Sequence, residues 1–258
     1  MDFTRKKYRK LLVSLIDKGY SAITFADYMQ KTRPTRFVIL RHDVDLKPKN
    51  SLATACIEAS LGIKASYYFR AVPESWDDAV IKEIASLGHE IGYHYESLAT
   101  CNGDISAALR DFEINLGKLQ QLAPVYTICM HGSPRSKWDN KDLWKNKSYR
   151  EYGILGEPYF DVDFSDVFYL TDTGRQWDGY KVSVRDKIPV YQNRWCSEGL
   201  VYHSTNDIIL SLNAGNLPHH IMMTTHPQRW DDNILFWTKE FVLQKTKNLV
   251  KRLIISQS

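Results

Sequence analysis

The sequence predicts an α/β fold in which mostly parallel strands form a barrel, with long loops over the carboxyl ends of the strands. Short apolar runs alternate with amphipathic segments at the spacing of strand–helix–strand units, which favours a parallel sheet. No Gly-x-Gly-x-x-Gly or Walker loop follows any apolar run, which disfavours a nucleotide-binding open sheet and favours a barrel. Five of the apolar runs end at polar or ionisable residues, as strands do at the active face of a parallel barrel.

In the first half of the chain, strands and helices alternate regularly. Apolar residues at helical spacing predict a helix over 8–18 that ends at Gly19, and the continuous apolar run at 37–40 predicts a strand buried on both faces. Asn50, Asp77 and Asp104 each precede a helical pattern and are expected to cap it. The remaining expected elements are helices at 50–62, 77–88 and 104–122 and strands at 65–69, 90–93 and 125–130.

The second half of the chain is less regular. Residues 137–193 are rich in Trp, Tyr and Asp and show only weak periodicity, so we expect long loops with short strands there. Beyond them, Asn206 is expected to cap a helix that extends to about residue 214. A strand at 221–225 and an amphipathic helix at 233–254 complete the chain.

Composition places the chain among globular proteins. Its 258 residues are 43% hydrophobic and 25% charged, which excludes disordered, collagenous and coiled-coil proteins. This length fits one domain, 1–258, in which residues 1–35 form a helical segment packed on the barrel. The chain has 34 basic and 30 acidic residues, and the excess of +4 looks spread along it, for example at 5–10 and 137–147. We therefore expect solvated charged faces and no nucleic-acid partner.

Cysteine usage and hydropathy predict a soluble protein in the reducing cytoplasm. No Cys-x-x-Cys pair is present, which excludes a zinc ribbon, and Cys56 and Cys129 lie in apolar patterns typical of buried thiols. The N-terminus is charged and lacks the apolar core of a secretory signal. No apolar run approaches the roughly 18 residues that a membrane span needs.

The candidate chemistry lies where the apolar runs end. In a parallel barrel these ends converge on one face, so the residues that follow them are expected around one cavity. Charges at strand ends cost free energy unless they are paired or coordinate an ion, so core packing alone does not explain them. The residues concerned are Asp43, Asp45, Arg70, His94, Glu96, His131 and His226.

The two aspartates suggest metal-assisted hydrolysis. In such a site one carboxylate binds a cation and the other takes a proton from water. The alternative for Asp43 and Asp45 is a turn or helix-capping role ahead of Pro48. His94 lies close to Glu96 in the sequence. Because other acidic and basic residues also lie at strand ends, a role for His94 as a metal ligand is favoured over a structural role.

The two later histidines have different expected roles. His131 precedes Gly-Ser-Pro, a turn signal, and is expected either to bind the metal or to hydrogen-bond substrate. His226 is followed by Pro227, which ends the strand and leaves the ring at the rim of the cavity. A general acid is expected at that place, with a structural histidine as the alternative.

Tryptophans in the loops suggest contacts with sugar rings. Trp138, Trp177, Trp195 and Trp230 lie outside periodic helices, so they either pack the loops or stack on the apolar faces of a sugar. The expected substrate contacts are Arg70, Glu96, Arg135, Trp177 and Trp230.

Four motifs, spread over about residues 36–236, resemble the polysaccharide deacetylase superfamily of carbohydrate esterase family 4 type. Arg-His-Asp-Val-Asp at 41–45 stands where that family has Thr-Phe-Asp-Asp-Gly, and Lys-Ala-Ser-Tyr-Tyr-Phe at 64–69 resembles its Lys-Ala-Thr-Phe-Phe strand. Gly-His-Glu-Ile-Gly-Tyr-His at 88–94 is the nearest match, to Gly-His-Glu-Ile-Gly-Asn-His. Thr-Thr-His at 224–226 resembles the family's late strand-end histidine.

The resemblance implies a distorted (β/α)7-type barrel and a divalent metal ion, Zn²⁺ by preference. It implies that Asp43 is the catalytic base, that Asp45 and His94 bind the metal, and that His226 is the general acid. The family's second metal histidine falls at Leu98, so Glu96 or His131 would have to replace it. Because Val44 separates the two aspartates, the base and the ligand could also be exchanged.

The function that the resemblance implies is removal of an acetyl group from an N- or O-acetylated sugar. The partner expected is a carbohydrate, in particular a nucleotide- or lipid-linked precursor in bacterial surface-polysaccharide biosynthesis. One alternative is a member of the same fold that binds carbohydrate without turnover. Another is a hydrolase of a C–N bond that is not an acetamide.

Overall fold

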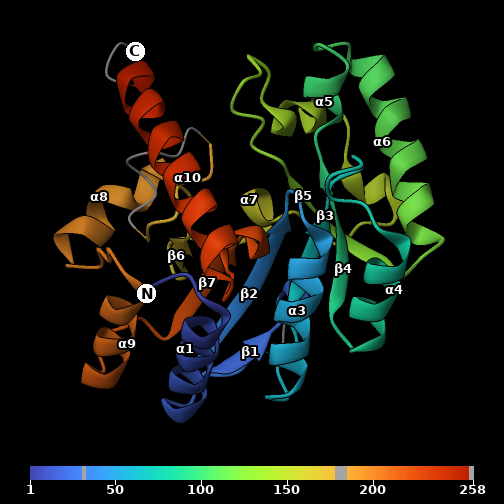
Figure 1. Ribbon diagram of the computed structural model, residues 1–258. Helices are drawn as coiled ribbons and strands as arrows, with labels where there is room; N and C mark the ends of the chain where they lie inside the picture. The colour runs from blue at the N-terminus through green and yellow to red at the C-terminus, as the bar shows by residue number, and fades with distance from the viewer. Residues whose placement is uncertain (31–32, 178–184, 256–258) are drawn as a thin grey trace.

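The computed structural model describes residues 1–30, 33–177 and 185–255, with side chains through residue 249. Its centre is a seven-stranded sheet in which every pairing is parallel, in the order β5–β4–β3–β2–β7–β6, with β1 also pairing with β2 (Figure 1). The strands are β1 Ser21–Ile23, β2 Phe37–Val44, β3 Ser66–Phe69, β4 Glu90–Tyr95, β5 Val125–Met130, β6 Phe168–Thr171 and β7 His220–Thr225. The predicted α/β class with a mostly parallel sheet is confirmed.

The sheet is not closed into a complete barrel. Within the described ranges β5 and β6 are the two ends of the strand order and do not pair. Two neighbouring residues connect these ends by their side chains. Arg185 donates from Nη1 to the carbonyl oxygen of Gly132, beyond β5, at 2.6 Å. Asp186 accepts a hydrogen bond from the Thr171 hydroxyl of β6 at 2.7 Å.

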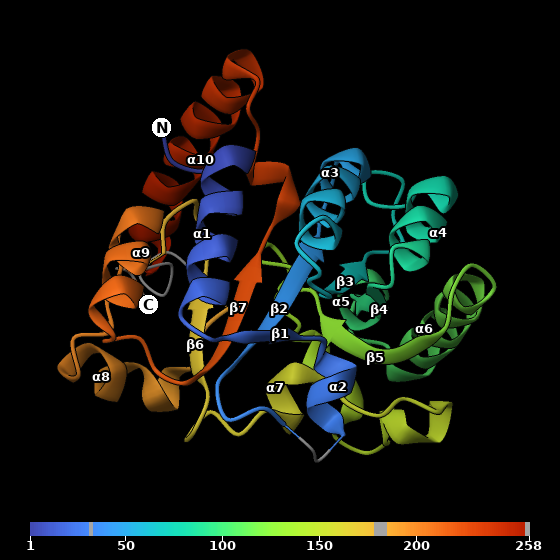
Figure 2. The same cartoon turned by 90° about the horizontal axis from the view of Figure 1, so that it is seen from below.

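Helices lie around the outside of the sheet, with α1 between α9 and α3 and with α4 beyond α3 (Figure 2). The helical elements are α1 Arg5–Asp17, α2 Phe25–Met29, α3 Pro48–Ala59, α4 Asp78–Ser86, α5 Ser97–Thr100, α6 Ile105–Gln120, η1 Asn140–Trp144, η2 Tyr149–Tyr152, α7 Pro158–Asp161, α8 Pro189–Ser197, α9 Thr205–Ala214, η4 Pro227–Arg229 and α10 Ile234–Ile255. Among these described helices, none is long and apolar enough to cross a bilayer.

The helix starts follow the capping rules in part. Asp77 and Asp104 accept backbone N–H bonds at the starts of α4 and α6, as predicted. The prediction for Asn50 is wrong, because α3 begins earlier, at Pro48, whose fixed φ suits the first helical turn. The prediction for Asn206 is also wrong, because Ser204 caps α9 in a reciprocal pair with Asp207.

Several elements differ from the sequence-based expectation. The strand predicted at 37–40 continues as β2 to residue 44, so Arg41 and Asp43 belong to the strand. The N-terminal segment contains β1 as well as helices, and the irregular region contains β6 and α8. Cys129 is buried as predicted, whereas Cys56 is exposed on α3.

Gly92 of β4 makes room for the Tyr68 ring of the neighbouring strand β3. A Cβ atom at position 92 would lie 2.3 Å from that ring, so the ring packs there only because the residue is glycine. Two residues earlier in β4, Glu90 accepts hydrogen bonds from the Ser66 hydroxyl and from the backbone N–H of Ala26 in α2. These bonds satisfy a buried carboxyl group at the end of the sheet opposite the strand carboxyl ends.

Candidate active site

Four strands bring the predicted residues together at their carboxyl ends. His94 Nε2 lies 3.7 Å from an oxygen of Asp43 and 3.7 Å from Asp45 Oδ1. His131 Nε2 lies 3.6 Å from Asp45 Oδ1, and His226 Nε2 lies 3.8 Å from Asp45 Oδ2. Asp45 is therefore the centre of the group, with three imidazole rings around its carboxylate.

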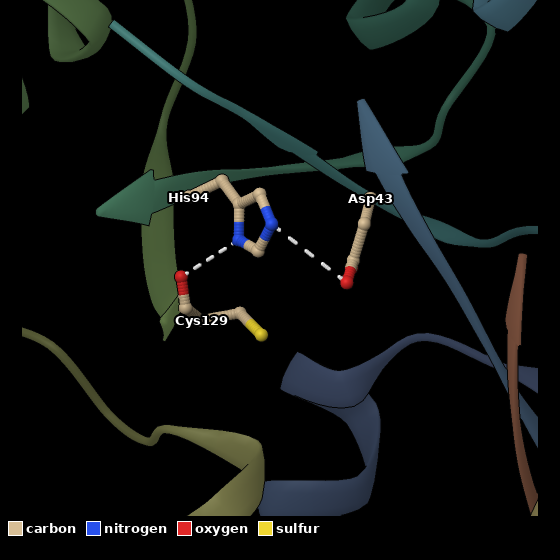
Figure 3. A group of neighbouring side chains, drawn as sticks. All are labelled: Asp43, His94 and Cys129. Carbon is tan, nitrogen blue, oxygen red and sulfur yellow. Dashed lines mark hydrogen bonds and ion pairs between the residues drawn. The ribbon is translucent and has the colours of Figure 1, made fainter. Parts of the chain in front are cut away.

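The environment of His94 determines which ring nitrogen is available. Its Nδ1 lies 2.9 Å from the carbonyl oxygen of Cys129, to which only an N–H can bond, so Nδ1 carries the proton. Burial lowers the pKa of His94 to about 4, so the ring is neutral at pH 7. The lone pair of Nε2 therefore points toward Asp43, as Figure 3 shows, and Asp45 Oδ1 lies at the same distance from it. A neutral imidazole held in this tautomer is the usual form of a metal ligand.

His131 is oriented by a carboxylate in the same way. Its Nδ1 lies 2.8 Å from Glu96 Oε2, which leaves Nε2 facing Asp45. Arg70 in turn donates to both oxygens of Glu96, and it also donates to the backbone carbonyl of Asp45. Burial opposes ionisation of Glu96, but His131 and Arg70 together lower its pKa to about 2.

This geometry gives Arg70 and Glu96 a clear structural role. The two were predicted to contact substrate, and the structure pairs them with each other beneath His131. Residues in such positions orient a metal-binding histidine, because they hydrogen-bond to the ring nitrogen that does not bind the metal.

One oxygen of Asp45 indicates that the group fits a cation. Oδ1 is buried and has no hydrogen-bond partner among the described residues, although Gln228 donates to Oδ2 at 3.3 Å. Unpaired buried carboxylate oxygens are costly, and this one faces the Nε2 atoms of His94 and His131. A divalent cation between these three atoms would satisfy all of them, and two imidazoles with one carboxylate suit Zn²⁺.

A second candidate metal group shares His94. Ligand atoms of Asp43, His94 and Cys129 lie within 4.8 Å of one another (Figure 3). However, both Asp43 oxygens already accept hydrogen bonds from Arg41. Burial raises the pKa of the Cys129 thiol well above its usual value, which disfavours the thiolate that a metal requires. Asp45, His94 and His131 are therefore the better ligand set.

Asp43 is held as an ion by a buried arginine that sequence reasoning did not single out. Arg41 donates from Nε and Nη2 to the two oxygens of Asp43, at 2.9 and 2.7 Å. Burial opposes ionisation, but Arg41 and His94 lower the pKa of Asp43 to about 2. Arg41 also lies 3.8 Å from Asp186, the residue that reaches β6 across the open edge of the sheet. Arg41 could have been identified from the sequence, because it lies two residues before Asp43 and therefore on the same face of the strand.

His226 is paired with a second residue that the sequence analysis missed. Its Nδ1 lies 2.6 Å from Asp172 Oδ1, and its backbone N–H donates to Asp172 Oδ2. Burial lowers the pKa of His226 and Arg229 lowers it further, but the charge and the hydrogen bond of Asp172, together with the charge of Asp45, raise it above its ordinary value. Asp172 directly follows the apolar run of β6, so the strand-end pattern could have identified it.

The remaining predicted substrate residues lie outside this group. Trp177 and Trp230 are only 4% and 2% exposed, and their ring N–H groups donate to Thr205 and Asp172. The expected open surface for stacking a sugar ring is therefore not formed by these two side chains, which pack inside the protein. Arg135 is exposed on the loop after β5.

Comparison with known proteins gives only distant structural likeness. No protein-family model and no curated protein matches the sequence. Among solved structures, a CE4 family pseudoenzyme from Bacillus anthracis is similar at 11% identity and a TM-score of 0.40, over 86% of this chain and 66% of that chain. A mutant of that pseudoenzyme, with restored enzymatic activity, gives 12% identity and a TM-score of 0.41, over 86% and 69%. At such values the likeness says nothing about chemistry, which depends on the site itself.

Proposed function

We propose that this protein is a metal-dependent hydrolase that removes an acetyl group from an N- or O-acetylated sugar. The observation that supports it most is the unpartnered Oδ1 of Asp45, which faces the Nε2 atoms of His94 and His131 in the described part of the chain. Beside this group lie a carboxylate, Asp43, and a histidine of raised pKa, His226. A cation site flanked by a base and an acid is what hydrolysis of an amide or ester requires.

Asp45, His94 and His131 would hold the metal ion. A divalent cation bound there, Zn²⁺ by preference, would polarise the acyl carbonyl and make a water molecule more acidic. The chain prepares these ligands by holding the Nδ1 of each ring at an acceptor, so that the Nε2 of both rings faces Asp45.

Asp43 and His226 would divide the proton transfers. Asp43 stays ionised because Arg41 holds it, and it would accept the proton of the attacking water. Its low pKa makes it a modest base, so the cation's effect on water would have to compensate. His226, whose protonated form Asp172 stabilises, would then donate Nε2–H to the departing sugar nitrogen or oxygen.

The substrate class rests on the resemblance of the sequence motifs. A sugar precursor, nucleotide- or lipid-linked, in bacterial surface-polysaccharide biosynthesis is the proposed carbohydrate, and the cytoplasm is the proposed location. The deacetylated sugar and acetate would be the products.

The test combines metal content with acetate release from acetylated amino sugars and sugar esters. We expect about one equivalent of divalent metal in wild type and a large loss in Asp45→Asn and His131→Gln. Glu74→Gln and Asp139→Asn, which change carboxylates outside the proposed ligand set, serve as controls. Acetate release should be abolished by Asp43→Asn while metal content is kept. Metal-free wild type, after several divalent ions have been offered, would contradict the proposal.

Two alternatives predict different results in the same assays. A carbohydrate-binding protein without turnover would bind sugar equally well in wild type and Asp43→Asn and would release no acetate from any substrate. A hydrolase of another C–N bond would yield a product whose mass decrease differs from that of an acetyl group.

A further inference from the structure

The C-terminal helix α10 presents an apolar surface that the described part of the molecule does not cover. Of its described side chains, six large apolar ones are between 45% and 77% exposed: Ile234, Leu235, Phe236, Val242, Leu243 and Leu249. Leu235, Val242 and Leu249 are seven residues apart, so they form a single stripe along the helix. Six exposed large apolar side chains on one helix are more than the single ones scattered over an ordinary surface, and such a concentration marks a site of interaction.

The helix is anchored to the protein by a different face. Trp237 donates its ring N–H to the carbonyl oxygen of Asp2 at 2.7 Å, and the Arg175 guanidinium lies 4.3 Å from the centre of the Trp237 ring. Near the end of the described side chains, Asn248 donates to the carbonyl oxygen of Gly174 at 2.7 Å. These contacts orient the helix and leave the apolar stripe turned away from the domain.

Helix α10 carries a local positive excess. Residues 234–255 contain five basic residues and one acidic residue, a balance of +4, and the whole chain has 34 basic and 30 acidic residues, also +4. The remainder of the chain has 29 of each, but the run at 5–10 within it has five basic residues and no acidic one, so local positive charge is found in more than this helix. Lys239, Lys245 and Lys247 are exposed beside the apolar residues.

The position of α10 relates this surface to the candidate site. The helix follows β7 and η4, and Figure 1 shows it rising from the end of β7, where His226 lies, toward the C-terminus. The helix therefore extends on the side of the molecule where the strands end.

We propose that α10 lies on an anionic lipid bilayer, with Leu235, Val242 and Leu249 inserted among the lipids and the lysines at the headgroups. Exposed apolar residues combined with an excess of lysine are the features of helices that bind in the plane of a membrane interface. Long lysine side chains can keep their amines at the headgroups while their stems cover apolar surface. A second copy of the chain fits less well, because pairing two such helices would bring two charges of +4 together.

The two acidic residues just before α10 do not weaken this surface. Asp231 lies 3.7 Å from Arg5, and the side chain of Asp232 accepts the backbone N–H of Lys6. Both therefore face the N-terminal segment of the chain.

The test is cosedimentation of the metal-free full chain with vesicles, without substrate, so that its result does not depend on hydrolysis. Wild type should bind vesicles of mixed phosphatidylglycerol and phosphatidylcholine, release from them at high salt, and stay in solution with phosphatidylcholine alone. Lys239→Gln/Lys245→Gln/Lys247→Gln should weaken binding about a hundredfold, since each lysine is worth about a factor of five at an anionic surface. Leu235→Gln/Val242→Gln/Leu249→Gln should weaken it at least about tenfold.

Matched controls change the same residue types elsewhere. Ile114→Gln/Val190→Gln/Leu210→Gln alters exposed apolar residues of other helices, and Lys10→Gln/Lys82→Gln/Lys118→Gln alters exposed lysines. Both should bind vesicles like wild type, and thermal unfolding should show that all variants fold.

Three results would overturn the proposal. The first is wild type that remains in solution with anionic vesicles, and the second is equal loss of binding in the control variants. The third is a different binding partner for α10. This would be shown by a dimer in solution that only the apolar α10 variant dissociates, or by duplex DNA that binds more tightly than the vesicles.

Discussion

The imidazole Nδ1 of His226 lies 2.6 Å from Asp172 Oδ1, and this bond joins the carboxyl ends of β7 and β6. Asp172 is fully buried and also accepts hydrogen bonds from Arg229 and from the Trp230 ring. A carboxylate held this firmly fixes the orientation of the ring, so the Nε2 of His226 faces Asp45.

If His226 is the general acid, Asp172→Asn should reduce kcat by about a hundredfold and change KM little, because a correctly placed proton donor contributes about that factor. The measurement is steady-state kinetics on the best acetylated substrate. Asp139→Asn, which alters an aspartate that caps η1, should keep kcat. Equal kcat in wild type and Asp172→Asn would exclude the pair from the reaction.

Glu96→Gln should weaken metal binding about 10- to 100-fold, since Glu96 orients His131 through its Nδ1. Competition with a chromophoric chelator measures this directly. Glu74 is exposed, so Glu74→Gln is the matched control and should bind metal like wild type. Unchanged affinity in Glu96→Gln would mean that His131 is not a ligand.

Glu157 should make the stability of the protein depend on pH between about 4.5 and 7. Its carboxyl group is fully buried, and burial raises its pKa to about 7 although the backbone N–H groups of Met130 and Tyr159 donate to it. The folded protein then holds a proton that the unfolded chain has lost, so this contribution is complete below pH 4.5 and is lost as the pH rises to 7.

The expected loss is about 3 kcal/mol of unfolding free energy across that range, from the difference between the two pKa values. Urea unfolding at several pH values, compared between wild type and Glu157→Gln, should show a flatter pH dependence in the variant. Parallel curves would show that Glu157 is not the source of the dependence.

Gly92→Ala should destabilise the protein by about 1–3 kcal/mol or more, because the new Cβ would lie 2.3 Å from the Tyr68 ring. Gly117→Ala is the matched control. Gly117 lies inside α6, where an added Cβ would meet no neighbouring described atom within 4 Å, so alanine there should stabilise by about 0.5–1 kcal/mol. Chemical denaturation of the two variants gives both values, and equal stability changes would contradict the packing argument.

Local rules predicted much of the fold because they act over few residues. The strand predicted at 125–130 has the same bounds as β5. Asp77 and Asp104 were correctly predicted as helix caps, because capping depends only on one side chain and on the helical turn that follows it. The irregular region was harder to predict. There, β6 is only four residues long, and its alignment depends on pairing with β7, which is far away in the sequence.

By itself, the sequence determined the parallel α/β class and the strand ends at which chemistry could occur, because periodicity and strand-end polarity follow from local backbone geometry. Tertiary structure decided which side chains meet. It placed His131 against Glu96 and Asp45, and it placed Asp172 on His226. These pairs depend on strand order and on register. They also depend on burial, because burial strengthens the interaction of paired charges and makes unpaired charges costly.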